Sequence, residues 1–293
     1  PISRGVPPTP SQQDTPTPQL VAEETYTSTN QVKPITAEQA ASAIAESEAN
    51  ETASRGDSPE GAEAVTCPTT SEAIFDLIPI EGPHSEHPDT YHADFDLAIR
   101  GYAPVSKKLE FVFYYGDTDP EAPQLAGIFQ PHRQGGIIQG YQVNDWRWSA
   151  NECGGEARGC QAEPIDEWDI TLAGMATTPG EPISIASRGP EIYRGGFKAL
   201  VIYASDDKIT VVYTRNDTVG TGYALHLEGL CVDPNLVGLY RAQNSPDGWR
   251  TSGWLPALRN DQLVGIAAGN EIRVAIRDRG SFMDPRSSKD WWR

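Results

Sequence analysis

The clearest pattern of alternating apolar and polar positions lies near the C-terminus. Ile272, Val274 and Ile276 are separated from one another by a single arginine or alanine. This period of two predicts a strand with these three side chains facing a core. Gly265 and Gly280 flank the strand and predict turns on both sides of it.

Other short runs rich in β-branched, aromatic and aliphatic residues predict further strands. They cover residues 109–115, 137–143, 199–203, 209–215 and 223–228. A short helix is predicted from Asp233, which suits its N-cap, and Pro234, which suits its first turn. Leu236, Leu239 and Tyr240 recur at helical spacing and predict its buried stripe. The chain is thus predicted to be all-β with little helix.

Composition divides the chain into three predicted parts: a tail (1–70), a β-rich segment (71–163) and a C-terminal β module (164–293). The first 60 residues are acidic and rich in Pro, Ser and Thr, with Tyr26 as their one aromatic residue. Such a segment is predicted to be disordered or extended, apart from a short helix over 36–49. The tail is interpreted either as a stalk or as a plain terminus, and it can dock on a partner or a neighbouring subunit.

The net charge of −18 argues against nucleic acid or an anionic membrane as a partner. No apolar run approaches the roughly 20 residues of a transmembrane helix. The first residue is Pro, so the start is expected to be either a processed end, from which an export signal has been removed, or a truncated one. These features favour a secreted or cell-envelope protein.

The cysteine count is even, and none of the four cysteines stands in a CxxC zinc motif. Cys153 and Cys160 bracket a Gly-rich loop and are predicted to form one disulfide. Cys67 and Cys231 would then form a second one, joining the end of the tail to the C-terminal module. Disulfides would fit an oxidising compartment, whereas the alternative is four free buried thiols.

The C-terminal module resembles the lysostaphin-type zinc endopeptidases, which cut peptide cross-bridges in cell walls. Asp261–Gly265 stands where the family has GQxIG, and Gly180–Ile183 stands where it has GxPV. Arg277, Gly280 and the Asp284–Pro285 pair follow the family's R-x2-G-x3-DP spacing. The resemblance covers about residues 164–293 and implies a β-sheet or sandwich module with a groove that receives a peptide strand.

The same alignment implies that the family's chemistry is lost. Glu271 and Arg273 stand at the His-x-His positions, and Arg215 takes the place of a third active-site histidine. Ile170 and Gly174 replace the family's other His and Asp ligands. We therefore predict no catalytic residue, no metal and no cofactor.

The resemblance instead implies a non-catalytic cell-surface or envelope module, with a binding or structural role. Arg215, Glu271 and Arg273 are its candidate groove residues. Glu271 and Arg273 share a strand face and are expected to pair weakly with each other. The expected partners are a cell-wall peptide or glycan, or another surface protein.

Two other functions stay open. An active zinc peptidase would use His92 and Asp96 as ligands, with a further histidine from His84, His87, His132 or His226. A carbohydrate-binding β-sandwich would use an aromatic surface made of Trp146, Trp148, Trp249 and Trp254. Neither a phosphate-binding loop, a dinucleotide fingerprint nor a nucleophile elbow occurs in the sequence. A glycosidase-type carboxylate pair stays open, because sequence does not reveal carboxylate separations.

Overall fold

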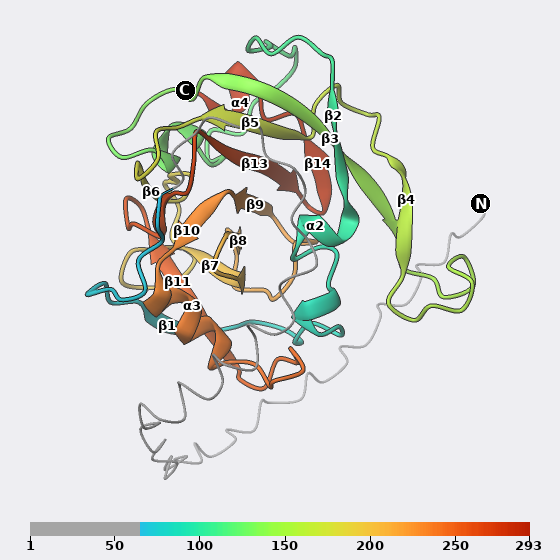
Figure 1. Ribbon diagram of the computed structural model, residues 1–293, viewed down its shortest axis with the longest axis vertical. Coiled ribbons are helices and arrows are strands. Elements are labelled where there is room, and N and C mark those ends of the chain that lie inside the picture. The colour runs from blue at the N-terminus through green and yellow to red at the C-terminus, as the bar shows by residue number, and fades with distance from the viewer. Residues whose placement is uncertain (1–64) are drawn as a thin grey trace, which may run out of the picture. The chain divides into compact units, whose positions relative to one another are not determined.

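The computed structural model describes residues 65–293, which are built mainly of strands (Figure 1). The strands are β1 (Asp76–Pro79), β2 (Tyr102–Val105), β3 (Ile137–Arg147), β4 (Cys160–Pro164), β5 (Leu172–Ala176), β6 (Pro182–Ile183), β7 (Phe197–Ala204), β8 (Lys208–Val212), β9 (Tyr223–Glu228), β10 (Leu230–Val232), β11 (Trp254–Arg259), β12 (Gly265–Ala267), β13 (Glu271–Asp278) and β14 (Ser281–Met283). The helices are η1 (Asp89–Tyr91), α2 (Leu97–Arg100), η2 (Leu125–Ile128), α3 (Pro234–Arg241) and α4 (Ser288–Trp291). The all-β prediction is confirmed. The helix predicted over 36–49, and the predicted tail as far as residue 64, lie outside the described residues.

One large antiparallel sheet carries most of the strands, in the order β1-β11-β7-β8-β9-β13-β5-β3-β2. β14 pairs with β13, and β4 pairs with β3 beside this path. A second, small sheet has the order β10-β12-β6. The strand predicted from the alternating pattern, β13, therefore lies in the middle of the large sheet, between β9 and β5.

The predicted boundary between residues 163 and 164 does not separate two structural units. β1 pairs with β11, and β3 pairs with β5, so strands from both sides of that boundary alternate within one sheet. The described residues 65–293 accordingly belong to one compact unit. Composition changes little at residue 163, and pairing between distant strands cannot be read from it.

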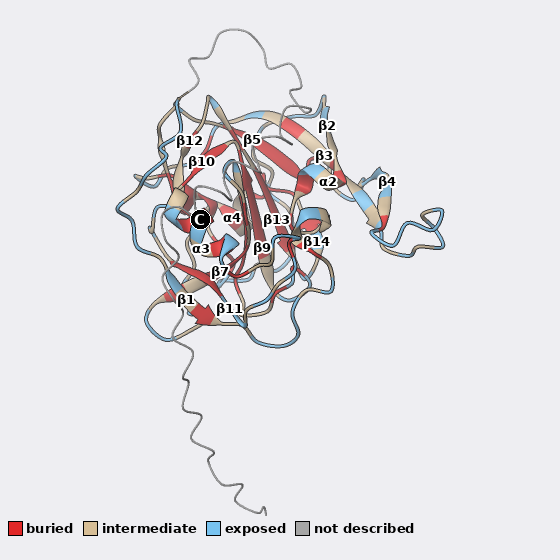
Figure 2. Ribbon diagram, turned by 60° about the horizontal axis from the view of Figure 1, so that its bottom comes forward, coloured by how far each residue is buried: buried red, intermediate tan, exposed pale blue. Residues whose placement is uncertain are grey.

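The apolar pattern of β13 produces the core as predicted. Ile272, Val274 and Ile276 are fully buried in the main hydrophobic cluster. The opposite face of the same sheet is also covered, since β9 is buried from Ala224 to Glu228 (Figure 2). The central strands are therefore largely enclosed on both faces, and a buried polar side chain there needs a hydrogen-bond partner.

The predicted strand at 109–115 is wrong. Only Val112 makes a ladder contact, a single bridge to Ser287, and Phe113 and Tyr115 are exposed. The stretch is held instead by side chains that reach the C-terminal segment, including Phe111 on Trp292. Its aromatic content suits a strand, but strand propensity depends on an available pairing edge.

The helix predicted after Asp233 is confirmed as α3. Asp233 accepts a hydrogen bond from the Asn235 amide at 2.9 Å, and Pro234 occupies the first turn. Its buried residues are Leu236, Val237 and Tyr240, so Val237 replaces Leu239 in the predicted stripe. The Tyr240 hydroxyl donates to the Ile202 carbonyl and fixes the helix on β7.

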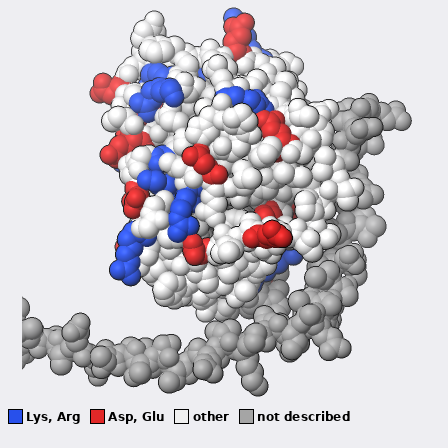
Figure 3. Space-filling model, turned by 90° about the vertical axis from the view of Figure 1, so that its left-hand side faces the viewer, with Lys and Arg blue, Asp and Glu red and all other residues white. Residues whose placement is uncertain are grey.

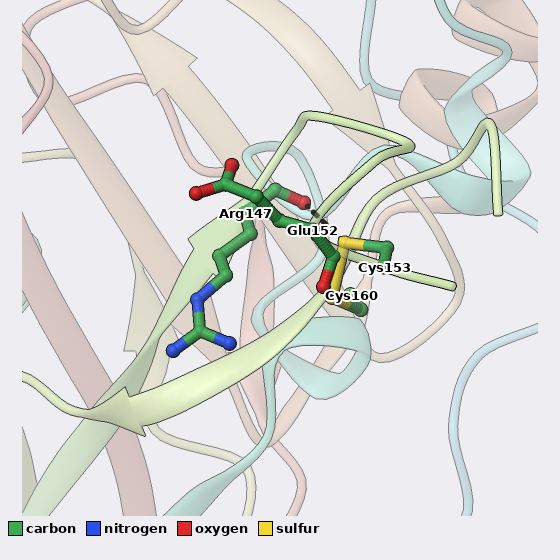
Figure 4. The surroundings of a disulfide bond; sticks show 4 residues. All are labelled: Arg147, Glu152, Cys153 and Cys160. Atoms are coloured by element: carbon green, nitrogen blue, oxygen red, sulfur yellow. Dashed lines mark hydrogen bonds between the residues drawn. A yellow bond between two sulfur atoms is a disulfide. The ribbon is translucent and has the colours of Figure 1, made fainter. Parts of the chain in front are cut away.

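Both predicted disulfides are present. Cys67–Cys231 joins the N-terminal end of the described chain to β10 in the small sheet. Cys153–Cys160 closes the loop between β3 and β4, with Arg147 and Glu152 beside it (Figure 4). The β3–β4 hairpin projects from the body as an arm (Figure 2). The first disulfide thus links two segments that are far apart in the sequence, and the second stabilises the tip of the arm.

Candidate functional site

The large sheet curls strongly between β9 and β2. In a flat sheet these strands would lie about 19 Å apart, since three strands stand between them. The Tyr102 hydroxyl of β2 nevertheless donates to Glu228 Oε2 of β9 at 2.6 Å. The sheet is therefore concave on this side, and α2 lies in the opening of the curve (Figure 1).

A row of polar side chains crosses the concave face where the curl is tightest. Arg273 of β13 is paired in register with Glu228 of β9, and Glu228 is paired with Lys208 of β8. Glu271 lies two residues from Arg273 and therefore points to the same face. Tyr102 of β2 and Tyr141 of β3 contact this row from the other side of the curved sheet. We call these residues, Tyr102, Tyr141, Lys208, Glu228, Glu271 and Arg273, the polar cluster.

Glu228 is the most deeply buried acid of the polar cluster, with 4% of its surface exposed. Its Oε2 accepts the Tyr102 hydroxyl, whereas its Oε1 is buried with no hydrogen-bond partner among the described residues. Burial raises the pKa of Glu228, because the charged form is poorly solvated there. Burial and the Glu228 carboxylate likewise raise the pKa of the Tyr102 hydroxyl.

Arg273 is the most accessible cation of the polar cluster, with 33% of its side chain exposed. Its Nε lies 3.6 Å from Glu228 Oε2, beyond hydrogen-bond length, and its guanidinium lies over the Tyr102 ring at 5.4 Å. The pKa of Arg273 is raised although burial lowers it, since Tyr102 and Glu228 outweigh the burial. Among residues 65–293, the Arg273 guanidinium has no hydrogen-bond acceptor.

Glu271 pairs with a tyrosine and not with Arg273 as predicted. The Tyr141 hydroxyl donates to Glu271 Oε1 at 3.0 Å from across β5. Gly174 of β5 makes this contact possible, because a Cβ at Gly174 would fall 1.7 Å from Glu271 Oε1. Burial and the neighbouring carboxylate raise the pKa of Tyr141 to about 12. Because Gly174 has no side chain, the Glu271 carboxylate can occupy the space beside β5.

Gly174→Ala is expected to displace the Glu271 carboxylate with little change in stability. The far end of a glutamate can swing away, and Ala lowers the entropy of the unfolded chain by an amount worth about 0.4–1 kcal/mol. Without Glu271 beside it, the pKa of Tyr141 should fall from about 12 toward 10. NMR titration of ring-labelled tyrosine measures this, with Tyr141→Phe assigning the signal. An unchanged Tyr141 pKa would contradict the described contact.

Arg215 does not join the other two predicted groove residues. Along β8, Lys208 lies at the Arg273 end of the sheet and Val212 lies at the Arg277 end, and Arg215 continues beyond Val212. There Arg215 forms an ion pair with Glu81. The correction follows from strand direction: Arg215 and Arg273 are about seven residues of rise apart, roughly 23 Å.

The structure does not bring His92 and Asp96 together as metal ligands. The His92 ring stacks on Phe95 at 3.8 Å, and its Nδ1 accepts the Asp94 amide. The Asp96 carboxylate caps α2 through the Ala98 amide and pairs with Lys208 at 3.2 Å. Within residues 65–293, no group of three or more His, Cys, Asp or Glu side chains is placed to hold a metal.

Burial lowers the pKa of His92 to about 4, so this ring is neutral in the folded protein at neutral pH. The unfolded chain would bind that proton near pH 6.5. Stability is therefore expected to fall between pH 6.5 and 4, by at most about 3 kcal/mol from this group. His92→Asn should flatten the profile in this window. Glu228 has a raised pKa, so its titration changes stability in the opposite direction. The contribution of His92 is therefore measured as the difference in free energy of unfolding between the wild type and His92→Asn, by urea unfolding at each pH.

Two of the four tryptophans predicted to form an aromatic surface contact each other in the structure. Trp146 and Trp148 contact each other at 6.1 Å on the arm, and Trp148 stacks on His87 at 5.0 Å. Trp249 and Trp254 are about half exposed, the first in a loop and the second at the start of β11.

Trp291 and Trp292 pack against the protein itself, because exposing both would leave an apolar patch in water. Trp291 is buried and donates from Nε1 to the Asp284 carbonyl. Trp292 donates to the Pro285 carbonyl and packs against Phe111. The C-terminal end of the chain is thus part of the fold.

The sequence did not identify Tyr102, Tyr141, Lys208 or Glu228 as site residues. A weak signal existed for Glu228, since it ends an otherwise apolar strand at a position that the alternation places on the same face as His226. The tyrosines gave none, because their role depends on the curl of the sheet. The curl brings strands together that are more than 100 residues apart in the chain.

Charged side chains outside the polar cluster are mixed in sign. On the face shown in Figure 3, basic and acidic residues alternate over the surface. An open pocket with a volume of about 410 Å³ lies between the arm and β14, above the buried Arg100 and Arg277. Its rim is mostly acidic, and the two guanidiniums at its floor are occupied by Asp94. This pocket is therefore a less suitable binding site than the polar cluster.

Comparisons with protein-family models, with curated proteins and with solved structures find no match.

Proposed function

We propose that this chain is an exported cell-surface or envelope module that binds its ligand through the polar cluster without catalysing a reaction. The observation that carries the proposal is Arg273. Its guanidinium is one-third exposed on a concave sheet and is held only loosely by Glu228. Free donors beside fixed carboxylates suit hydrogen bonding to a polar ligand.

Two further observations support the proposed location. The two disulfides are typical of proteins that fold in an oxidising compartment. No helix among residues 65–293 is long and apolar enough to cross a membrane.

The resemblance to lysostaphin-type peptidases supports a non-catalytic role at this place. Gly174 and Arg273, which replace two ligands in that alignment, are register partners on adjacent strands. β6 and β12, two stretches that carry the resemblance, are also paired. Arginine has no lone pair to offer a metal and stays cationic at working pH, so it disfavours zinc at this position.

The proposal is tested by binding to purified cell wall and isolated envelope material. Arg273→Met removes the charge but keeps the length of the side chain, and it is expected to weaken binding by about tenfold or more. Arg215→Met is the matched control, since it makes the same change at the opposite end of the sheet. Equal binding by wild type and Arg273→Met, or no binding by either, would refute the proposal. Cleavage of wall peptides by the untreated protein would refute its non-catalytic part.

A further inference from the structure

The Glu228 Oε1 atom is the strongest indication of what the polar cluster binds. A buried acceptor without a partner is rare in folded proteins, and the missing donor commonly comes from water or a ligand. Glu228 is held in place by the Tyr102 hydroxyl on Oε2, so its second oxygen is fixed in direction. The polar cluster therefore presents one preset acceptor that lacks a donor.

The Arg273 guanidinium can supply hydrogen-bond donors beside this acceptor. Within the described part of the chain, the Arg273 guanidinium makes no hydrogen bond, although it is 3.6 Å from Glu228 Oε2. Tyr102 and Tyr141 pack edge to face at 5.5 Å next to it. A complementary ligand must bring a donor for Glu228 and an acceptor for Arg273, separated by a short distance, together with a surface that tolerates tyrosine rings.

The charges of the polar cluster select against strongly charged ligands. An anionic ligand would satisfy Arg273 but would face both Glu228 and Glu271. A cationic ligand would satisfy Glu228 but would face Arg273 and Lys208. A neutral ligand whose groups are both donors and acceptors avoids either conflict, and hydroxyl groups have this property.

The sheet topology selects against an extended peptide bound through its backbone. Such peptides add to a sheet at an unpaired strand edge. β8, β9, β13 and β3 carry every residue of the polar cluster except Tyr102, and these four strands are paired on both sides. Recognition here must use side chains projecting from a sheet face, which suits a sugar ring with hydroxyls at its rim and C–H groups on its face.

We infer that the polar cluster binds a neutral glycan, with one hydroxyl donating to Glu228 Oε1 and a neighbouring hydroxyl accepting from Arg273. This inference rests on the proposed function and names its ligand class. The raised pKa of Glu228 is consistent with this inference. Burial leaves the carboxylate poorly solvated, so a hydrogen bond from the hydroxyl of a bound sugar would stabilise its charged form.

The test uses the intact chain and calorimetric titration with neutral tetrasaccharides of β-1,4-linked N-acetylglucosamine, β-1,4-linked glucose, α-1,4-linked glucose and β-1,4-linked mannose. Pentaglycine and tetragalacturonate serve as the peptide and anionic probes. Binding of at least one neutral tetrasaccharide, and of neither other probe, is the expected result. Binding of pentaglycine or tetragalacturonate alone, or of no probe, would overturn the inference.

Glu228→Gln assigns the role of the orphan oxygen. Its carbonyl can still accept the Tyr102 hydroxyl, while its amide replaces Oε1 by a donor. Affinity for the bound tetrasaccharide should fall by about tenfold to a hundredfold. Thermal stability should stay equal or rise, which a merely structural role would not produce. Glu163→Gln on the exposed part of β4 is the matched control and should bind as the wild type does. Wild-type affinity in Glu228→Gln would overturn the assignment.

The two proposals fail separately. If the protein binds cell wall and the neutral tetrasaccharides do not compete, the glycan inference is wrong while envelope binding stands. If a tetrasaccharide binds and cell wall does not, the envelope role is wrong while the ligand class stands.

Discussion

Replacing Cys67 and Cys231 together with alanine is expected to lower the free energy of unfolding by about 5 kcal/mol in the chain-entropy description of a disulfide. The two cysteines are 164 residues apart, so the bond closes a loop that contains most of the described chain when it is unfolded. Cys231 is buried in β10, whereas Cys67 is exposed in a segment with few backbone hydrogen bonds to the rest. Urea unfolding of the oxidised proteins at pH 7 measures the difference.

The second disulfide provides the comparison. Cys153 and Cys160 are seven residues apart and close only the loop at the end of the arm. Their replacement by alanine should lower the free energy of unfolding by about 2–3 kcal/mol or less, because short loops lose less entropy on closure. An equal or larger effect from Cys153 and Cys160 would show that loop length does not determine the stabilisation in this protein.

The sequence predicted those parts of the structure that depend on local pattern. Alternation placed Ile272, Val274 and Ile276 in the core, and capping chemistry placed α3 at Asp233. The even cysteine count, with one close pair, led to the correct disulfides. Each of these inferences needs only the spacing of residues along the chain, which sequence states directly.

The candidate site depended on contacts that spacing does not contain. Glu271 and Arg273 were correctly placed on one strand face, but their partners Tyr141 and Glu228 come from distant strands. Arg215 was placed with them because alignment by motif ignores how far a strand runs past its neighbour. Propensity also failed at 109–115, where only Val112 makes a bridge, to Ser287. Sheet curl and strand register thus decided what the sequence left open.

A buried ion cluster beneath α2 also depends on residues that are far apart in the sequence. Asp94 Oδ1 accepts from Arg100 at 2.6 Å and from Arg277 at 2.7 Å, and both arginine side chains are about 5% exposed or less. Burial raises the pKa of Asp94, but the Arg277 and Arg100 guanidiniums outweigh it and hold this pKa well below its usual range. One carboxylate therefore neutralises part of the charge of two interior cations.

Asp94→Ala is expected to lower the free energy of unfolding by about 3–5 kcal/mol, because it leaves the buried Arg277 without its ion-pair partner and Arg100 with only the exposed Asp145. Asp145→Ala is the matched control: Asp145 lies 3.6 Å from Arg100 but is 67% exposed, so its loss should cost less than about 1 kcal/mol. Asp94 has a depressed pKa, so its contribution is present above its unfolded value of about 4 and is lost as the pH falls further. Urea unfolding at several pH values should accordingly show the wild type and Asp94→Ala converging below pH 4. A difference that stays constant into acid would show that packing, and not charge, explains the role of Asp94.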